Sequence, residues 1–227
     1  MNKMSKNATM LWTGGKESSL ALYDAELLGY EVRNLVTFVP NEAEFLAHPL
    51  SFMKCQAEAL QLPHYTLEVN EPFKESYENA ICYLKERYGI DTLITGDIAE
   101  VNGHPNWIRE CSKYSDIDVL TPLWGHNRLD LLNRFLSCKF EAIFSCVKKP
   151  WFTEEWVGMK LNRDSLEHLS KINAGAKLDI CGEQGEYHTL VLNGPPFKKS
   201  ILITVYNTQA RDSLMYIDIQ KLSLQEK

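Results

Sequence analysis

Hydrophobic and polar positions follow two alternating periods along the first half of the chain. Short apolar runs of strand length end at glycine or proline, and between them apolar residues recur every three or four positions, as on one face of a helix. The expected strands are Ala8–Trp12, Glu31–Val39, His64–Val69 and Asp91–Thr95, and the expected helices are Ser18–Leu28, Ser51–Leu60 and Glu75–Arg87. This β-α-β-α-β-α-β order is typical of an α/β fold, in which a parallel sheet carries helices on both faces.

The pattern changes in the second half, where glycine and proline turn signals become denser from Pro150 onwards. The expected helices here are Asn106–Lys113 and Leu129–Leu136, and the expected strands are Ala142–Val147, Thr189–Leu192 and Ile201–Tyr206. No low-complexity linker or internal repeat interrupts the chain. We therefore expect two domains, residues 1–124 and 125–227, that pack closely and meet near Gly125.

Composition narrows the class of protein. The 227 residues are 44% hydrophobic and 24% charged, as in an ordinary soluble globular chain. The 24 Lys and Arg against 30 Asp and Glu give a net charge of −6, which argues against binding nucleic acid over a broad surface. A small anionic ligand stays compatible, because backbone N–H groups bind phosphate without net positive charge. No apolar stretch is long enough to span a membrane and no secretory signal is visible, so no membrane partner is expected.

The cysteine pattern indicates free thiols. The six cysteines are Cys55, Cys82, Cys111, Cys138, Cys146 and Cys181, and no two have the spacing C-x-x-C. This scatter fits neither a disulfide framework nor a zinc or iron–sulfur site. We therefore expect a cytoplasmic protein in a reducing compartment.

The segment Thr13-Gly14-Gly15-Lys16-Glu17-Ser18-Ser19 is the sharpest local feature, since it joins the first expected strand to the first helix. Two glycines let a ligand approach the backbone, the hydroxyls can donate to phosphate, and the helix N-terminus attracts an anion. The spacing matches neither G-x-x-x-x-G-K-[ST] nor G-x-G-x-x-G. Taken alone, the string is equally compatible with a plain strand–helix turn in which Ser18 or Ser19 caps the helix.

The position of this loop after the first strand of a βαβ chain strengthens the phosphate interpretation. Thr13–Ser18 resembles the S-G-G-x-D-S loop of the PP-loop ATP pyrophosphatases, with Thr13 in place of Ser and Glu17 in place of Asp. Further strings then recur in order along nearly the whole chain. They are Cys55–Leu60 with Leu62-Pro63, Gly96-Asp97-Ile98, Pro122–Gly125, Cys181–Thr189 and Gly194–Phe197.

Together these strings resemble the diphthine–ammonia ligase family, and His104-x-x-Trp107 is more similar to its bacterial-type members. The resemblance implies a HUP-like ATP-binding domain in the first half and a smaller, family-specific α+β domain on the substrate side in the second. It also implies an amide ligase: ATP adenylates a carboxylate and releases pyrophosphate, and ammonia then displaces AMP. The family's known acceptor is diphthine on elongation factor 2, whereas the acceptor of bacterial-type members is an unknown acid. Whether the chain forms a homo-oligomer stays open.

The resemblance assigns the pyrophosphate cradle to the loop and its neighbouring strand end. The expected nucleotide-binding residues are Thr13, Gly14, Gly15, Lys16, Glu17, Ser18, Ser19, Gly96 and Asp97. Asp97 is also the candidate Mg²⁺ ligand, with a helix N-cap as the alternative role. The backbone of 38–40 is a candidate resting place for adenine. The expected catalytic residues are Lys16, Glu183, Glu186 and His188.

Roles within Cys181–His188 stay open between several chemistries. Glu183 and Glu186 could bind ammonium, act as a base toward the amine, or hold a second metal, and His188 could carry a proton or meet a phosphate. A solvated polar turn is the alternative for both glutamates. Cys181 is left out of the catalytic set because amidation needs no thiol.

Three further side chains and two other functions also stay open. His48 either faces the nucleotide or lies on a surface loop, and His104 with Trp107 either covers the ligand or belongs to the core. A PP-loop tRNA-modifying enzyme is one alternative function, although such enzymes usually need paired cysteines. A regulatory protein that binds ATP or AMP without turnover is the other.

Overall fold

The computed structural model describes residues 6–100, 105–175 and 178–227, which form two compact units. The first unit consists of residues 1–13, 17–44 and 62–125. The second consists of residues 14–16, 45–61 and 126–227, so two short segments of the first half of the chain pack with the second half. Within the described ranges, no helix combines the length and the apolar composition that crossing a membrane requires.

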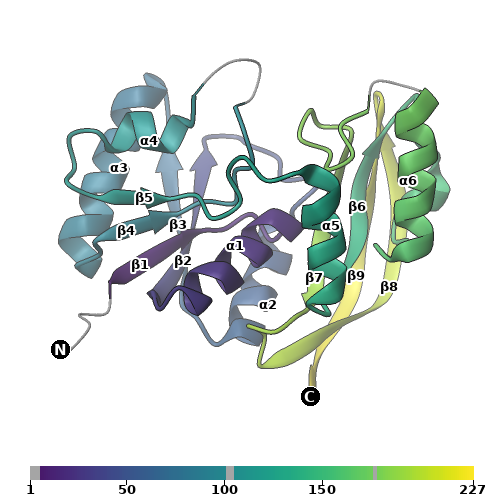
Figure 1. The fold of residues 1–227 in the computed structure, drawn as a ribbon, viewed down its shortest axis with the longest axis horizontal. Helices are drawn as coiled ribbons and strands as arrows, with labels where there is room; N and C mark the ends of the chain where they lie inside the picture. Colours follow the sequence, from purple (N-terminus) through teal and green to yellow (C-terminus); the bar gives the residue numbers. More distant parts are fainter. Residues whose placement is uncertain (1–5, 101–104, 176–177) are drawn as a thin grey trace. The chain divides into compact units, whose positions relative to one another are not determined.

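The first unit is built on a five-stranded parallel sheet in the order β3-β2-β1-β4-β5. Its strands are β1 (Asn7–Leu11), β2 (Glu31–Pro40), β3 (His64–Val69), β4 (Thr92–Ile94) and β5 (Asp118–Leu120). Its helices are α1 (Lys16–Leu27, of which Lys16 packs with the second unit), α3 (Phe73–Tyr88) and α4 (Trp107–Ser112). Figure 1 shows α1 on one face of the sheet and α3 with α4 on the other. This arrangement confirms the α/β class expected from the alternating pattern and agrees with the HUP-like domain that the family resemblance implies.

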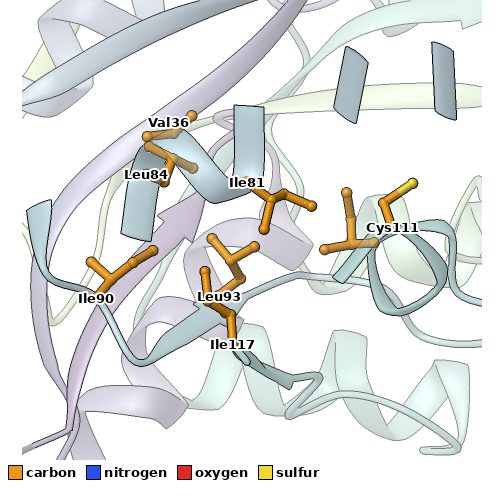
Figure 2. Close-up of a cluster of buried hydrophobic side chains, with 8 residues drawn as sticks. Val36, Ile81, Leu84, Ile90, Leu93, Cys111 and Ile117 are labelled. Carbon is orange, nitrogen blue, oxygen red and sulfur yellow. The ribbon is translucent and has the colours of Figure 1, made fainter. Parts of the chain in front are cut away.

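One face of this sheet is closed by an aliphatic cluster. The members come from β2, α3, β4, α4 and the turns beside them, and Figure 2 shows their side chains meeting between the helices and the sheet. They are Val36, Ile81, Leu84, Ile90, Leu93, Ile108, Cys111 and Ile117. Burial of this apolar surface holds α3 and α4 against the sheet. It thereby also fixes the positions of the strand ends, which the helices do not cover.

The second unit is built on a four-stranded antiparallel sheet in the order β7-β6-β9-β8. Its strands are β6 (Glu141–Lys148), β7 (Tyr187–Asn193), β8 (Lys199–Arg211) and β9 (Leu214–Glu226). Its helices are α2 (Leu50–Leu60), α5 (Arg128–Ser137), the short 3₁₀ helix η1 (Glu154–Trp156) and α6 (Arg163–Gly175). Residues 142–147 of β6 are all buried, so both faces of this strand are covered. The antiparallel sheet and its helices agree with the α+β class expected for the second half, but with residues 14–16 and 45–61 this unit is not the smaller of the two.

An aromatic cluster fixes the beginning of β7. Tyr187 packs against Phe144 with ring centroids 5.1 Å apart and against Phe152 at 5.9 Å. Both phenylalanines also contact Trp156 edge-on at 5.0 Å. Because Tyr187 is fully enclosed, the loop that precedes it and the residues that follow it have a rigid anchor.

Candidate functional site

The first unit contributes two neighbouring strand ends to the candidate site. β1 and β4 pair in parallel with Met10 opposite Ile94, so the segments that follow them leave the same edge of the sheet. Gly96 lies against the beginning of α1, because a Cβ at this position would be 2.8 Å from both the carbonyl carbon of Glu17 and the amide nitrogen of Ser18. The close approach requires glycine and brings 96–97 beside the first turn of α1.

Hydroxyl groups line this first turn. Thr13 donates from Oγ1 to Oγ of Ser18 at 3.2 Å. Ser18 and Ser19 are buried, and Oγ of Ser19 has no hydrogen-bond partner among the described residues. A buried hydroxyl without a partner is costly, and a ligand or water that reaches it relieves that cost. Thr13, Ser18 and Ser19 therefore fit the phosphate-binding role expected from the sequence. Phosphate binding by these residues stays a prediction.

Asp97 is held by its neighbours rather than by a helix. Its Oδ2 accepts a hydrogen bond from Oγ1 of Thr95 at 2.7 Å and another from the side-chain amide of Asn106. Asn106, and not Asp97, caps a helix: its Oδ1 accepts from the backbone N–H of Arg109 at 2.9 Å at the start of α4. The N-cap alternative for Asp97 is therefore wrong, whereas its role as a Mg²⁺ ligand stays a prediction.

Three aromatic rings, from β2, α3 and α4, contact one another in turn. Phe38 lies 4.8 Å from Tyr77, whose ring meets Trp107 edge-on at 5.9 Å. Trp107 is 45% exposed, so the interpretation of this tryptophan as a core residue is wrong. His104, its expected companion, lies outside the described residues.

The glycine-rich segment 14–16 packs within the second unit through a glutamine clamp. Gln56 is completely buried on α2, and its Nε2 donates to the carbonyls of Gly14 at 2.9 Å and Val191 at 2.8 Å. The Gly14 carbonyl also accepts from the backbone N–H of Val191 at 3.1 Å. Gly14 has a φ of +79°, and a Cβ there would be 2.3 Å from Oε1 of Gln56, so only glycine fits.

Lys16 is buried and fixed at both its backbone and its side chain. The backbone N–H donates to Oγ1 of Thr189 at 3.1 Å. The ammonium donates to the Cys181 carbonyl at 2.6 Å and lies 4.6 Å above the centre of the Tyr187 ring. With only 4% of the residue exposed, a positive charge is held in a partly dehydrated environment, where it attracts an anion far more strongly than in water.

The loop before β7 is organised by two carboxylates. Glu186 is 2% exposed, and its two oxygens accept the backbone N–H groups of Asp179 at 2.8 Å and Gln184 at 2.9 Å. Asp179 binds Nε of Arg128 through Oδ2 at 2.6 Å and the Cys181 N–H through Oδ1 at 2.9 Å. These bonds fix the loop so that the Cys181 carbonyl is presented to Lys16.

Glu183, an expected site residue of this loop, and Cys181, which is not one, differ in their surroundings. Glu183 is partly exposed. The Cys181 thiol is buried and donates to the Arg128 carbonyl at 3.4 Å. The thiol is therefore used in a local contact, in keeping with its omission from the catalytic set.

Two histidines complete this part of the second unit. The rings of His48 and His188 meet edge-on with centroids 5.3 Å apart. Burial, the neighbouring His188 and the charge of Lys16 lower the pKa of His48 to about 3. Burial and Lys16 lower the pKa of His188 to about 4. Both imidazoles are thus neutral at physiological pH.

The second unit therefore brings together Lys16 and residues 181–189, which are more than 160 positions apart in the sequence. Sequence reasoning did not include Gln56, Tyr187 and Thr189 among the site residues. Each of the three lies inside a sequence string that supports the family resemblance, but no role in the site was assigned to it.

A metal held by protein side chains alone finds no support in the described ranges. No group of three or more His, Cys, Asp or Glu side chains among residues 6–100, 105–175 and 178–227 is arranged to hold an ion. Mg²⁺ in nucleotide enzymes is commonly bound by one or two carboxylates together with substrate phosphates. A single carboxylate such as Asp97 fits that pattern.

Comparison with known proteins gives consistent matches over both halves of the chain. The models named diphthamide synthase N-terminal domain and diphthamide synthase C-terminal domain match residues 6–117 and 127–224. Diphthine–ammonia ligases of Mus musculus and Homo sapiens are each 23% identical over 96% of this chain and 92% of their own length. The corresponding enzyme of Schizosaccharomyces pombe is 27% identical over 86% of this chain and 35% of its own length.

Among solved structures, a predicted subunit of tRNA methyltransferase from Methanocaldococcus jannaschii matches with a TM-score of 0.42 and 20% identity. The match covers 63% of this chain and 78% of that one.

Proposed function

Because the chain belongs to the diphthamide synthase family, we propose that it is an ATP-dependent amide ligase that joins ammonia to a carboxylate. A carboxylate oxygen attacks the α-phosphorus of ATP, the bond to the β-phosphate breaks, and pyrophosphate leaves. Ammonia then attacks the acyl carbon and loses a proton, and AMP leaves. The observation that carries this proposal is the packing of Gly14–Lys16 against residues 181–189 within the second unit, which joins the PP-loop-like segment to the most specific string of the family.

The residues at both strand ends fit ATP by their chemistry. Lys16 supplies a buried positive charge, the hydroxyl of Ser19 lacks a partner among the described residues, and Gly14 has the positive φ of +79° that the turn of the loop requires. Such groups are already in place before the reaction and stabilise the charge that develops on the leaving pyrophosphate. Thr13, Gly15, Glu17, Ser18 and Gly96 complete the proposed nucleotide site.

Mg²⁺ is proposed as the cofactor, with Asp97 as the residue that would hold it. Bound Mg²⁺ spreads the negative charge of the phosphates. Within the described residues, the hydrogen bonds from Thr95 and Asn106 both use Oδ2 of Asp97, which leaves Oδ1 for an ion or its water there.

The loop before β7 is proposed to serve the second half-reaction. Glu183 is partly exposed and can orient ammonia or accept its proton. Glu186 acts as a positioning residue, because both of its oxygens hold the loop backbone. In this way the loop holds the Glu183 carboxylate at a fixed position relative to the contact between Lys16 and the Cys181 carbonyl.

The acceptor is proposed to be a diphthine-type side chain or, in an organism without diphthamide, another carboxylic acid. The relatives named above are diphthine–ammonia ligases, which supports ATP, ammonia and a diphthine acceptor as substrates. The six free cysteines agree with a reducing cytoplasmic location.

Pyrophosphate release from ATP tests the function. We expect AMP and pyrophosphate to form when ammonia and either diphthine-bearing elongation factor 2 or another carboxylate acceptor are present. Failure of every acceptor would refute the ligase, and turnover triggered by tRNA alone would favour a tRNA-modifying enzyme. Gly15→Asp should abolish ATP binding, whereas Gly175→Asp, which adds the same carboxylate at the exposed end of α6, should not.

A further inference from the structure

His48 and His188 form a histidine pair in the second unit. His48 lies in the segment before α2, and His188 is the second residue of β7, so two separate elements bring the rings to a centroid distance of 5.3 Å. The pair lies close enough to the Lys16 ammonium for its charge to act on both rings. These three side chains are called the His–Lys cluster below.

The polar atoms of the pair lack partners among the described residues. Nδ1 of His48 is buried and makes no hydrogen bond there. No hydrogen bond from a described residue reaches the ring of His188 either. Buried polar groups in folded proteins are almost always paired, so an unpaired one calls for a ligand or water.

The charge of the cluster selects an anion. Both imidazoles are neutral, because burial and Lys16 disfavour their protonation. A cation placed against the rings would be repelled by the lysine, whereas an anion gains its charge and one N–H donor from each ring. An ammonium and two imidazoles supply three separate donors, which suits the several oxygens of a phosphate group better than the two oxygens of a carboxylate.

We propose that His48 and His188 bind the phosphate chain of ATP and the departing pyrophosphate, each through a ring N–H beside Lys16. This assignment rests on the proposed function for the identity of the anion. It gives His188 a binding role and adds His48, which lies more than 130 positions away in the sequence, to the same subsite. The unpaired nitrogens are then a feature of the ligand-free protein that ligand binding resolves.

Pyrophosphate itself is the probe that tests the assignment. Binding to the wild-type chain is measured by titration calorimetry and compared with His48→Phe and His188→Phe, which keep a ring of similar volume but remove the N–H groups. Each variant should weaken pyrophosphate binding about tenfold, the loss expected for one hydrogen bond to a charged group. His168→Phe, at an exposed histidine on α6 of the same unit, is the matched control and should bind like wild type.

Thermal stability separates a binding role from a structural one. Because the ring nitrogens are unpaired, the phenylalanine variants should unfold at the same temperature as wild type or higher in the absence of ligand at about pH 7.5. The stabilisation of the wild type by pyrophosphate should be much reduced in both. If one variant does not fold, the corresponding glutamine variant replaces it.

The outcomes distinguish this assignment from the proposed function. Unchanged pyrophosphate affinity in both variants, or no binding of pyrophosphate to the wild-type chain, overturns the assignment even if the ligase is active. Weakened binding in the variants supports it even if no acceptor yields AMP. Loss of ligand-free stability in both variants would indicate a structural role and would also overturn it.

Discussion

Acidification should destabilise this protein through His48 and His188, two largely enclosed histidines. In the folded chain the pKa is about 3 for His48 and about 4 for His188, whereas both titrate near the ordinary value of 6.5 when unfolded. Below pH 6.5 the unfolded chain therefore binds more protons than the folded chain. The free energy of unfolding falls as the pH falls from about 6.5 toward 4, and these groups have no effect above that window.

The loss of unfolding free energy depends on how far the pH lies below the pKa of the unfolded chain. Each pH unit below the unfolded pKa costs about 1.4 kcal/mol per histidine, so about 2 kcal/mol is lost per ring at about pH 5. Both side chains keep some exposure to solvent and influence each other, which reduces the figure. We expect a loss of about 2–4 kcal/mol for the pair, a large share of the 5–15 kcal/mol typical of a folded domain.

Denaturant unfolding at about pH 7.5 and about pH 5 measures this loss. Carboxylates titrate in the same range, so the comparison is made with the double variant His48→Phe/His188→Phe, in which their contribution is unchanged. The double variant should lose about 2–4 kcal/mol less than wild type on acidification, and His168→Phe should behave like wild type. Equal losses in the wild type and the double variant would refute the reasoning.

Three further substitutions test the contacts that hold the site. Gln56→Leu removes two buried hydrogen bonds, to the carbonyls of Gly14 and Val191, and should lower the free energy of unfolding by about 2–3 kcal/mol in denaturant titrations, and an unchanged stability would contradict the clamp. Gly96→Ala places a Cβ 2.8 Å from the backbone of α1 and should cost about 2 kcal/mol and most ATP turnover, whereas Gly175→Ala, in open space, should cost neither. Glu186→Gln turns an N–H donor toward a backbone N–H and should lower both stability, by about 2 kcal/mol, and turnover. Normal turnover with normal stability in that variant would remove Glu186 from the loop's support.

Most elements of the first unit could be predicted from the sequence, because residues that end strands and helices separate them. Each strand of the parallel sheet ends near a glycine, proline or polar residue, and α3 buries one apolar face against the sheet, so local pattern and tertiary structure agree there. The second unit was less readable. Helix α6 and strand β9 were not expected, although Asn162 and Ser165 form reciprocal side-chain-to-backbone bonds of 2.9 Å at the start of α6, a capping pattern visible in the sequence.

The candidate site was predictable in its parts but not in its assembly. The loop at 13–19 and the string at 181–189 each attracted attention through residue type and spacing. Nothing local specifies that the Lys16 ammonium binds the Cys181 carbonyl, because that contact depends on the tertiary packing of β7 and its loop. The role of Gln56 was hidden for the same reason: a glutamine in a helix looks solvated until the carbonyls that it binds are known.

Hydrogen-bond satisfaction separates residues that the sequence presents with equal weight. Glu186 and His188 are two positions apart in the string Cys181–Thr189, and both are candidates for chemistry. The carboxylate already accepts two backbone N–H groups, whereas the imidazole has no partner among the described residues. Glu186 is buried and uses both oxygens to hold backbone N–H groups, so it supports the site through that backbone, while a ring without a partner among the described residues is available to a ligand. Substituting Glu186 should therefore reduce stability and turnover together, and substituting His48 or His188 should reduce ligand binding while leaving the ligand-free protein intact.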